Sequence, residues 1–390
     1  MKILFLGLMF CEKSLQKAYT DSKCGVQMAP HLFQKRLTDG FSACEDVEIK
    51  IINIPPIGSF PINYRKLFIK GKLWEGNEQI GFLNLPAVKQ TYQRYALQKA
   101  VRRWLDSQPG SQTYYIIAYS IYEPFLDVIC NIKKDYKDIH ICVIQTDAVP
   151  GRGGMRNSKK IKKRGDRLVE KAKKVDSFVL LSEPLAEPLE VRDRPFVITE
   201  CICDSSQAAS KRKSQSENIF LYSGTTERIY GICEIVDAFK LLPDAQLWIC
   251  GAGNGDEYIL EAAKTHWNIQ HFGYVNQEQL QQLRDRCDFL INPRRPTGTY
   301  TKYSFPSKTA EYMMSEKPAV MYRLEGIPQE YNQYLNYLTA ENAIEIAEQL
   351  RALINTDYEE LAEKARKARV FMMDNKCAEN QAKRITKLFQ

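Results

Sequence analysis

The sequence has no long apolar run. No stretch among its 390 residues approaches the roughly eighteen consecutive apolar residues of a membrane-spanning helix, so none is predicted. A secretory signal peptide is also not expected, because the apolar segment 1–10 has no long basic region before it and no small-residue cleavage site after it. A buried first strand that opens into a loop at Gly7 is the better interpretation.

Metal-binding patterns are missing as well. The chain has no Asp-x-Asp pair, and Cys201-Ile202-Cys203 has the wrong spacing for a zinc site. The four histidines show no metal-ligand spacing: His31, His140, His266 and His271. We therefore expect neither a metal nor another cofactor. The eleven cysteines are scattered, many inside apolar strands, which favours free thiols in a reducing cytosol.

The best-known phosphate-binding loops are absent too, since the sequence contains neither a G-x-G-x-x-G fingerprint nor a Walker loop. Two shorter glycine turns, 223–226 and 251–253, each stand between an expected strand and an expected helix. Such a turn lets a phosphate approach the backbone closely. A glycine turn without a ligand is the commoner case, so both interpretations stay open.

What is present points to a sizeable α/β enzyme. A length of 390 residues with 44% hydrophobic content predicts two or three domains, each with a hydrophobic core. Apolar runs alternate with helical patterns in both halves, which predicts two doubly wound parallel sheets facing a cleft. Ligands of such sheets bind beyond the carboxyl ends of the strands. The loops that follow strands are therefore the expected place for chemistry.

The expected elements fall into two sets separated by a polar linker at 204–218. The first set has strands at 2–6, 47–52, 115–119, 139–146 and 177–181, a helix at 84–106 and an irregular region at 53–83. The second set has strands at 219–223, 246–250, 269–272, 289–292 and 318–322. Its helices are expected at 231–241, 255–264, 276–286, 306–315, 341–354 and 357–372.

The segment from Tyr300 to Glu311 is the most informative one, because it joins an apolar strand to an amphipathic helix. Pro306 suits the start of a helix. Exposed N–H groups, the positive end of the helix dipole and Lys308 one turn in would suit a diphosphate. Glu311 lies on the same face as Lys308 and could accept hydrogen bonds from ribose hydroxyls. The alternative interpretation is an ordinary surface helix with a serine-rich cap.

Several motifs in order make the chain resemble family 4 glycosyltransferases of the GT-B fold, particularly enzymes of bacterial capsule and exopolysaccharide synthesis. The matching stretches are 220–225, 230–232, 247–253, 272–273, 291–293, 303–312 and 317–318, with Gly326-Ile327-Pro328 beyond them. The resemblance is specific over about 217–390 and looser over 1–200. It implies an acceptor-binding domain at 1–203, a donor-binding domain at 219–372 and a segment at 373–390 that crosses back to the first domain.

The resemblance also implies a function and a site. A retaining transferase would move a sugar from a nucleotide sugar, most often a UDP-sugar, to a glycan or lipid-linked acceptor. The residues expected to act in catalysis are Lys308 and Asp147, with Arg228 as a substitute for cations that the family has and this chain lacks. The residues it assigns to donor binding are Gly7, Gly224, Thr225, Gly251, Gly253, Tyr274, Val275, Tyr303, Ser304, Phe305, Pro306, Ser307 and Glu311. Asp147 stands where the subgroup is commonly acidic. An Asp that only caps the segment after a strand would give the same sequence pattern.

The chain departs from the family at three positions. Thr225 and Tyr230 replace an Arg and a Lys that grip the diphosphate, which leaves Arg228 as the only cation of that loop. Tyr303 replaces the first of two glutamates and removes a carboxylate contact to the donor sugar. These losses motivate an alternative, a non-catalytic GT-B subunit that binds a glycan or a partner transferase. A GT-B sugar-nucleotide epimerase fits less well, because the paired acids and histidines it needs are not found.

The positive charge is concentrated in the first half. Residues 1–200 hold 32 Lys and Arg against 22 Asp and Glu, whereas the remainder holds 23 against 25. The basic residues gather in 152–174 and in a smaller set beside aromatic residues: Lys66, Lys70, Lys72, Lys99, Arg102 and Arg103. Such a surface suits an anionic membrane, and we expect a cytoplasmic protein held at the inner leaflet. Nucleic acid or a plain solvated face would produce the same pattern, and no nucleic-acid partner is expected.

Overall fold

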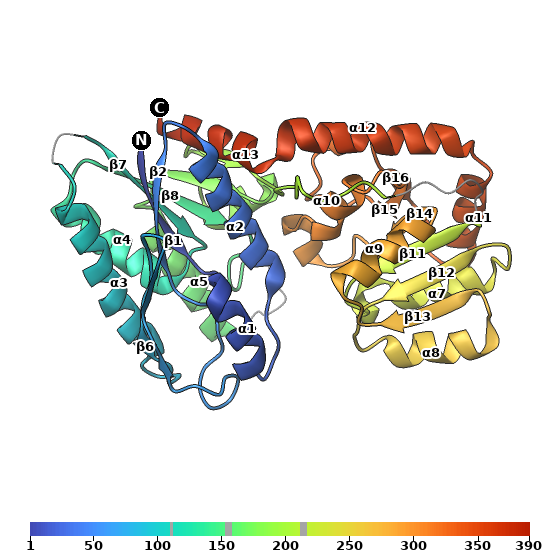
Figure 1. Ribbon diagram of the computed structural model, residues 1–390, viewed down its shortest axis with the longest axis horizontal. Helices are drawn as coiled ribbons and strands as arrows, with labels where there is room; N and C mark the ends of the chain where they lie inside the picture. Colours follow the sequence, from blue (N-terminus) through green and yellow to red (C-terminus); the bar gives the residue numbers. More distant parts are fainter. Residues whose placement is uncertain (110–111, 153–157, 211–216) are drawn as a thin grey trace. The chain divides into compact units, whose positions relative to one another are not determined.

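The computed structural model describes residues 1–109, 112–152, 158–210 and 217–390, and it divides into two compact units (Figure 1). Unit 1 comprises residues 1–202 together with 378–390, and unit 2 comprises residues 203–377. The chain therefore passes between the units twice. Of the expected linker 204–218, residues 211–216 lie outside the described part, while 204–210 belong to unit 2.

Unit 1 is built on an eight-stranded sheet in the order β10-β9-β8-β7-β1-β2-β5-β4. All neighbours in it are parallel except β4 and β5. The strands are β1 Lys2–Gly7, β2 Glu48–Asn53, β4 Lys72–Trp74, β5 Asn77–Gln79, β7 Tyr114–Tyr119, β8 Ile139–Gln145, β9 Ser177–Leu180 and β10 Phe196–Ile198. The point where the strand order reverses lies between β1 and β7, so the loops after these two strands adjoin the expected ligand crevice.

The region 53–83 was predicted to be irregular, but it carries four short strands. Two of them, β3 (Phe68–Ile69) and β6 (Phe82–Leu83), form a separate antiparallel pair. The other two, β5 and β4, extend the main sheet from β2. Each strand has only two or three residues, which is too short to show the period-two pattern on which strand prediction depends.

Helices cover the sheet of unit 1 on both sides. They are α1 Glu12–Asp21, α2 Met28–Ala43, α3 Lys89–Asp106, α4 Glu123–Asp135, α5 Lys159–Ala172, the short α6 Ala186–Leu189 and α13 Ala378–Thr386, with 3-10 turns at Glu183–Leu185 and Lys387–Phe389. The helix predicted at 84–106 begins five residues later, at Lys89. Pro86 explains the delay, since the residue before a proline avoids the helical conformation.

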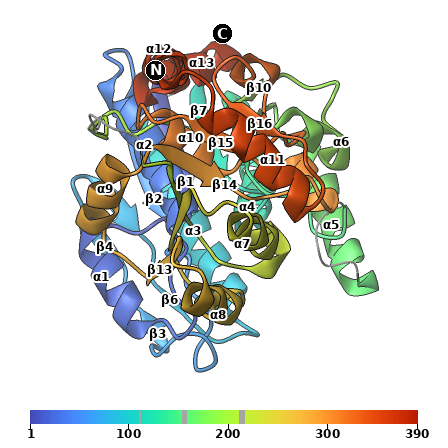
Figure 2. The ribbon, with the colours of Figure 1, turned by 90° about the vertical axis from the view of Figure 1, so that its right-hand side faces the viewer.

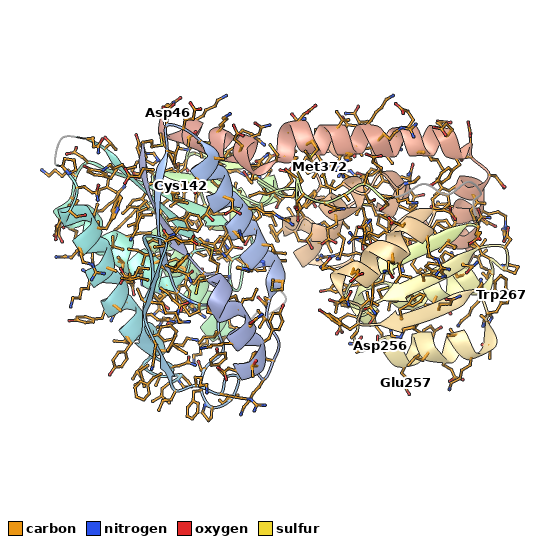
Figure 3. All side chains as sticks on the ribbon, viewed as in Figure 1. Asp46, Cys142, Asp256, Glu257, Trp267 and Met372 are labelled. Atoms are coloured by element: carbon orange, nitrogen blue, oxygen red, sulfur yellow. The ribbon has the colours of Figure 1, made fainter. Side chains whose placement is uncertain are left out.

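The core of unit 1 joins the two ends of its chain. Ile3 and Phe5 of β1 pack in one buried cluster with Leu37 of α2 and with Ala382 and Ile385 of α13. Helices α2 and α13 lie against each other (Figure 2), so closely that a β-carbon at Gly40 would overlap the carbonyl group of Ala378. Cys142, labelled in Figure 3, is a buried free thiol of the same cluster.

Unit 2 is a six-stranded parallel sheet in the order β13-β12-β11-β14-β15-β16. Its strands are β11 Ile219–Ser223, β12 Gln246–Cys250, β13 Ile269–Gly273, β14 Phe289–Asn292, β15 Ala319–Tyr322 and β16 Asn336–Leu338. Five were predicted, and β16 was missed. Numbered within the unit, the order is the 3-2-1-4-5-6 of dinucleotide-binding folds, so the ligand crevice is expected between the ends of β11 and β14.

The helices of unit 2 follow the predicted sequence of elements. They are α7 Ile232–Lys240, α8 Asp256–Thr265, α9 Gln277–Arg286, α10 Ser307–Met313, α11 Ala343–Ile354 and α12 Tyr358–Lys376, with 3-10 turns at Arg228–Tyr230, Thr299–Tyr303 and Gln329–Tyr331. One face of the sheet packs on α7, α8 and α11 through a single buried cluster. Helix α12 runs four residues further than predicted. Among the described residues, no helix has the length and apolarity required to cross a bilayer.

Candidate active site

Two glycine turns at the carboxyl ends of β11 and β12 pack against each other. Gly251 has a φ of +140°, and a β-carbon there would overlap the carbonyl oxygen of Gly224. A β-carbon on Gly253 would lie 2.6 Å from the carbonyl carbon of Thr226. These turns need glycine because two backbone segments come together. The sequence had left open whether a phosphate or a turn without a ligand requires these glycines, and the packing accounts for them without a ligand.

The backbone N–H groups of these turns already have partners inside the protein. Gly224 donates to the Cys250 carbonyl at 2.9 Å, and Gly251 donates to the Gly273 carbonyl at 2.8 Å. Gly253 donates to Oδ2 of Asp256 at 3.2 Å, and the Thr226 hydroxyl donates to the other oxygen of that carboxylate. A ligand could therefore meet Gly224, Gly251 and Gly253 by close packing. These N–H groups are not free to donate to it.

Arg228 lies on the 3-10 turn after β11 and is exposed. Its backbone N–H donates to Oδ1 of Asn254 at 2.8 Å, and its Nε donates to the Asn254 carbonyl at 3.2 Å. The guanidinium also lies 5.6 Å from the ring centroid of Tyr258. These contacts hold Arg228 against the loop that precedes α8. Thr225, the neighbouring candidate, is exposed, and its carbonyl accepts from the Tyr222 hydroxyl.

A second cation that sequence reasoning missed lies directly after β14. The backbone N–H of Arg294 donates to Oδ1 of Asn292 at 3.2 Å, which fixes its position at the strand end. Its guanidinium donates to the Ser304 hydroxyl at 3.2 Å and lies 5.3 Å from the ring centroid of Tyr230. Arg294 thus connects three of the segments that border the crevice between β11 and β14. The rule that ligands bind beyond strand ends could have found it.

Lys308, Glu311 and Arg284 form a charged cluster at the start of α10. Oε2 of Glu311 accepts from Lys308 Nζ at 2.8 Å and from Arg284 Nη2 at 3.1 Å. The Arg284 side chain is only 6% exposed, and its Nε has no hydrogen-bond partner among the described residues. Two cations share one carboxylate, so the cluster carries an excess of positive charge in a largely buried place.

The same two cations reach the end of β12. Burial raises the pKa of the Cys250 thiol to about 11, and the neighbouring positive charges of Arg284 and Lys308 oppose this rise. The positive charges of Lys308 and Arg284 thus act on the end of β12, the strand that leads into the glycine turn at 251–253. This brings the cluster to the carboxyl edge of the sheet, where ligands of doubly wound sheets bind.

Helix α9 positions Arg284 through a reciprocal cap. Asn276 Oδ1 accepts from the Gln279 N–H, and Gln279 Oε1 accepts from the Asn276 N–H, both at 2.9 Å. This capping box fixes the start of the helix. Leu280 and Leu283 bury one side of α9, and Arg284 follows on that side. The sequence gave no sign of the pair with Glu311, because the two residues are 27 positions apart.

Tyr312 ties α10 to the sheet. The side chain is fully buried, its hydroxyl donates to the Ile291 carbonyl at 3.2 Å, and it accepts from the Ser223 N–H at 3.4 Å. Burial raises the pKa of this hydroxyl well above its ordinary value, so it stays protonated. Lys308, one turn before Tyr312, is thereby held beside the ends of β11 and β14.

The remaining candidates of the 303–307 segment divide between surface and core. Phe305 and Pro306 are buried, and the Phe305 ring packs edge-on against Tyr331 at 5.3 Å, so both side chains serve packing. Pro306 was predicted to lie within the first turn of α10, but it stands at the N-cap of this helix. Ser307 is exposed, and Tyr303 and Ser304 are half-buried.

Residues 205–369 match the family model described as "Glycosyl transferases group 1". The match covers most of unit 2, and the chain is a glycosyltransferase. A search of curated protein sequences gave no match.

Solved structures similar to the glycosyltransferase are GT-B enzymes with two Rossmann-like units. Sucrose-phosphate synthase of Thermosynechococcus elongatus has a TM-score of 0.66 at 12% identity, over 100% of this chain and 98% of that one. HepE of Anabaena, solved in complex with UDP, has a TM-score of 0.63 at 12% identity, over 100% and 99%. Trehalose-6-phosphate synthase OtsA has a TM-score of 0.60 at 9% identity, over 100% and 99%. At these identities the likeness establishes the fold, and the predicted α/β architecture is confirmed.

The glycosyltransferase places Tyr274 and Val275 after β13, at the same edge of the sheet as the glycine turns. Tyr274 is 88% exposed, so its ring is accessible for stacking. Val275 is partly buried next to the N-cap of α9. Their predicted place near the nucleotide base stays a prediction.

In unit 1 of the glycosyltransferase, the loop after Gly7 is closed by its own side chains. Leu8 N–H donates to Gln34 Oε1 at 2.7 Å, Met9 N–H to Asn53 Oδ1 at 3.0 Å, and Phe10 N–H to His31 Nδ1 at 3.3 Å. These three N–H groups are not free for a diphosphate. Gly7 itself leaves room for Asn53, whose Oδ1 would lie 3.2 Å from a β-carbon there.

Asp147 follows β8 and is exposed. Its Oδ2 accepts from the Thr146 hydroxyl at 3.3 Å, and that hydroxyl also contacts the Tyr119 hydroxyl at 3.0 Å. Gln145 Nε2 donates to the Asp147 carbonyl at 2.6 Å. The carboxylate therefore stands at the carboxyl end of the unit 1 sheet with one oxygen committed to a neighbour, and its part in catalysis stays a prediction. Among the described residues, no group of three His, Cys, Asp or Glu side chains could hold a metal ion.

Proposed function

We propose that this glycosyltransferase transfers a sugar from a UDP-sugar with retention of anomeric configuration, as family 4 enzymes do. The observation that carries the donor site is the cluster of Lys308 and Arg284 around Glu311 at the edge of the unit 2 sheet. A diphosphate would satisfy the excess positive charge of this cluster. UDP is favoured as the nucleotide because HepE, of the same fold, was solved with UDP.

The chemical role follows from where negative charge develops. As the bond between the anomeric carbon and the diphosphate breaks, charge builds up on the departing diphosphate. Lys308, with Arg228 and Arg294 at the ends of the adjoining turns, would stabilise that charge. Positive charges that are already in place when the bond breaks need little reorganisation at that moment. Asp147 of unit 1 is proposed as a catalytic group on the acceptor side.

The acceptor in this proposal is a glycan or lipid-linked saccharide of capsular or exopolysaccharide synthesis, bound by unit 1. A lipid-linked acceptor implies work at a membrane surface, and we propose that α5 provides the contact. Lys159, Lys160, Lys162 and Lys163 are exposed, and none has an ion pair among the described residues. Four cations in the first turns of a helix oppose its dipole, so this arrangement costs stability unless an anionic surface compensates.

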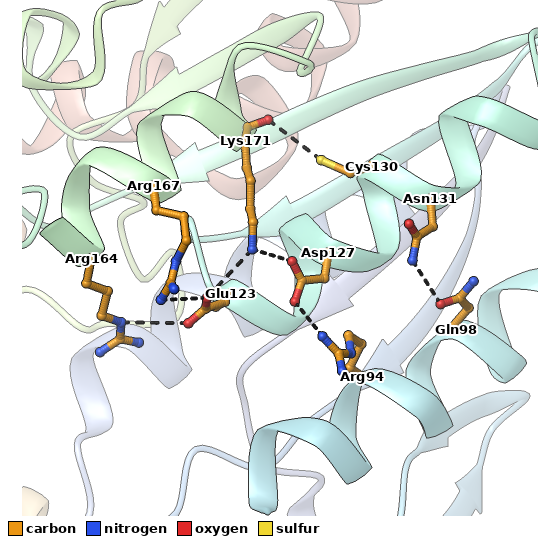
Figure 4. A network of polar contacts seen from close by, with 9 residues as sticks. All are labelled: Arg94, Gln98, Glu123, Asp127, Cys130, Asn131, Arg164, Arg167 and Lys171. Carbon is orange, nitrogen blue, oxygen red and sulfur yellow. Dashed lines mark hydrogen bonds and ion pairs between the residues drawn. The ribbon is translucent and has the colours of Figure 1, made fainter.

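The rest of the basic run at 152–174 is less available for binding an anionic surface than its sequence suggested. Residues 153–157 lie outside the described part of the chain. Figure 4 shows Arg164, Arg167 and Lys171 pointing at Glu123 and Asp127 of α4, with the Arg167–Glu123 pair at 3.0 Å. These charges hold α5 on α4. The lysines at 159–163 are therefore the proposed docking group, and the inner leaflet is its proposed target.

Binding and hydrolysis measurements test the donor. Calorimetry of the full chain with UDP and GDP should show binding, tighter for UDP, and a screen of nucleotide sugars should show slow hydrolysis of one UDP-sugar. The anomer released to an acceptor, read by proton NMR, should match the donor. No binding of either nucleotide at millimolar concentration would contradict the donor site. Tighter binding of GDP would reassign the base.

A further inference from the structure

A groove runs along the edge of the unit 1 sheet, between the β4–β5 hairpin and α3. It encloses about 700 Å³, and its walls include Lys72, Leu73 and Glu78 from the hairpin and Tyr95 and Lys99 from α3. A second hollow continues it along α3 toward Ser107 and shares Tyr95, Lys99 and Arg103 with the first. From Tyr95 to Ser107 the helix rises about 18 Å, at 1.5 Å per residue. The groove and this second hollow, which α3 and its C-cap residue line, together extend far enough for a chain of several sugar residues.

The hairpin side of the groove includes two glycines, which have no side chain. Gly71 and Gly81 face each other, and a β-carbon on Gly81 would lie 2.7 Å from the Gly71 nitrogen and 2.9 Å from the Ile69 carbonyl oxygen. A side chain is therefore excluded at Gly81, whereas a β-carbon on Gly71 would lie 3.3 Å from the Gln79 carbonyl oxygen and would press on the same backbone. The wall of the groove consists of backbone at these two positions.

Some of the charges in the groove are paired, and three cations have no ion pair among the described residues. Arg103 holds both carboxylate oxygens of Glu78, at 2.9 Å and 2.6 Å, and Arg102 pairs with Asp135. Lys50, Lys72 and Lys99 line the groove without an ion pair among the described residues, and the Lys50 ammonium donates to the Gly76 carbonyl. The groove consequently has a net positive charge from these three lysines.

Two apolar side chains stand open to solvent in the same groove. Leu73 is 79% exposed and Tyr95 is 73% exposed. Lys99 follows Tyr95 by four residues, so both lie on one face of α3. An exposed tyrosine offers a flat apolar ring with a polar end. The apolar face of a sugar ring can stack on such a surface while a charged substituent reaches the lysine.

We propose that this groove binds an anionic oligosaccharide, such as a glycan that carries carboxylates. Lys72 and Lys99 would pair with its negative groups, Tyr95 would stack on one ring, and Glu78 and Asp106 would accept hydrogen bonds from hydroxyls. A bilayer surface fits less well, because it cannot enter a groove and because these two carboxylates would repel it. The proposal shares with the proposed function only the class of ligand, and it requires no donor.

Calorimetry of the full chain without nucleotide tests this. A hyaluronan hexasaccharide, which carries a carboxylate on every second ring, should bind. Chitohexaose, of equal length and uncharged, should bind at least about tenfold more weakly. Tyr95→Ala and the double variant Lys72→Gln/Lys99→Gln should each weaken hyaluronan binding at least about tenfold. The matched control Lys160→Gln/Lys163→Gln removes two charges from α5 and should leave that binding unchanged.

Several results would overturn the proposal. Equal affinity for the two hexasaccharides would remove the role of charge, and equal losses in the groove and control variants would show a non-specific attraction. If the groove variants instead lost binding to phosphatidylglycerol vesicles or to a thymidine hexanucleotide, the groove would serve a membrane or a nucleic acid. Hydrolysis of a nucleotide sugar by the same variants is measured without acceptor, so failure of this proposal is distinct from failure of the proposed function.

Discussion

Glu311 accepts hydrogen bonds from two cations on a single oxygen, and this arrangement defines what Lys308 can do. Arg284 alone would satisfy the carboxylate. Lys308 is therefore the member of the cluster that can leave Glu311 and follow an anion without leaving a buried charge unpaired. Its side chain is 27% exposed against 6% for Arg284, which agrees with that division of roles.

Replacement of Lys308 by alanine should lower kcat by about two orders of magnitude or more, the usual cost of losing one donor to developing negative charge. The fold should persist, because Arg284 still pairs with Glu311. Initial rates of transfer or donor hydrolysis measure the effect, with circular dichroism to check folding.

The control for this change is Lys264→Ala on α8. Lys264 also pairs with a glutamate three residues away, Glu261, at 2.7 Å, but both side chains are largely exposed. An exposed pair of this kind contributes about 0–1 kcal/mol, so activity should stay near that of the unchanged protein. Near-normal turnover in the Lys308 variant would disprove the assignment of the diphosphate site.

At this scale the sequence located Lys308 and Glu311 through their spacing of three within one helix. It could not locate Arg284 or Arg294, because each acts across elements that only the folded sheet brings together. The three backbone donors after Gly7 show the opposite case. The resemblance assigned Gly7 to donor binding, but side chains remote in sequence occupy the three N–H groups that follow it.

At the scale of elements, the contact between the glycine turns at 223–226 and 251–253 decides whether the donor site keeps its shape. Gly251→Ala would place a methyl group onto the Gly224 carbonyl at a φ of +140°. Strain of this kind costs about 1–3 kcal/mol before the overlap is counted. We expect a lower urea midpoint and weaker UDP binding.

Gly273→Ala separates the cost of the left-handed backbone from the cost of the overlap. Gly273 also has a positive φ, +64°, but its β-carbon would meet nothing within 4 Å. This variant should lose about 1–2 kcal/mol from the left-handed backbone alone and keep its packing. Equal stability of the two alanine variants would mean that the turns do not press on each other.

Long elements were predicted well for a physical reason. Fully buried parallel strands such as β8 and β14 appear as continuous apolar runs between breakers, and helices such as α9 begin at a polar cap. Strands β4 and β5 were missed because three residues carry no periodicity, and their place is set by pairing with β2. The groove beside these two strands could therefore not be predicted from the sequence.

At the scale of the whole molecule, the net charge of +8 suggested a binding surface, and ion pairing decides which part of it is available. The docking group at 159–163 should bind vesicles that contain anionic lipid and release them at high salt, because the Debye length falls from about 10 Å at 0.1 M to 3 Å at 1 M. Each lysine near such a surface contributes about 1 kcal/mol. Lys160→Gln/Lys163→Gln should therefore weaken co-sedimentation about 30-fold.

The comparison variant is Lys134→Gln/Lys137→Gln, which removes two exposed lysines at the end of α4. Both double variants have the same net charge. If they lost vesicle binding equally, or if the unchanged protein bound neutral vesicles as well as anionic ones, the lysines of α5 would be no more than a solvated helix face.

The division of unit 1 into two chain segments sets an order of folding during synthesis. Ala382 and Ile385 of α13 complete a core that otherwise consists of residues before 203. Residues 203–377, by contrast, form unit 2 without a break. The ribosome therefore finishes unit 2 while unit 1 still exposes part of its apolar interior, and unit 1 can close only after residues 378–390 have emerged.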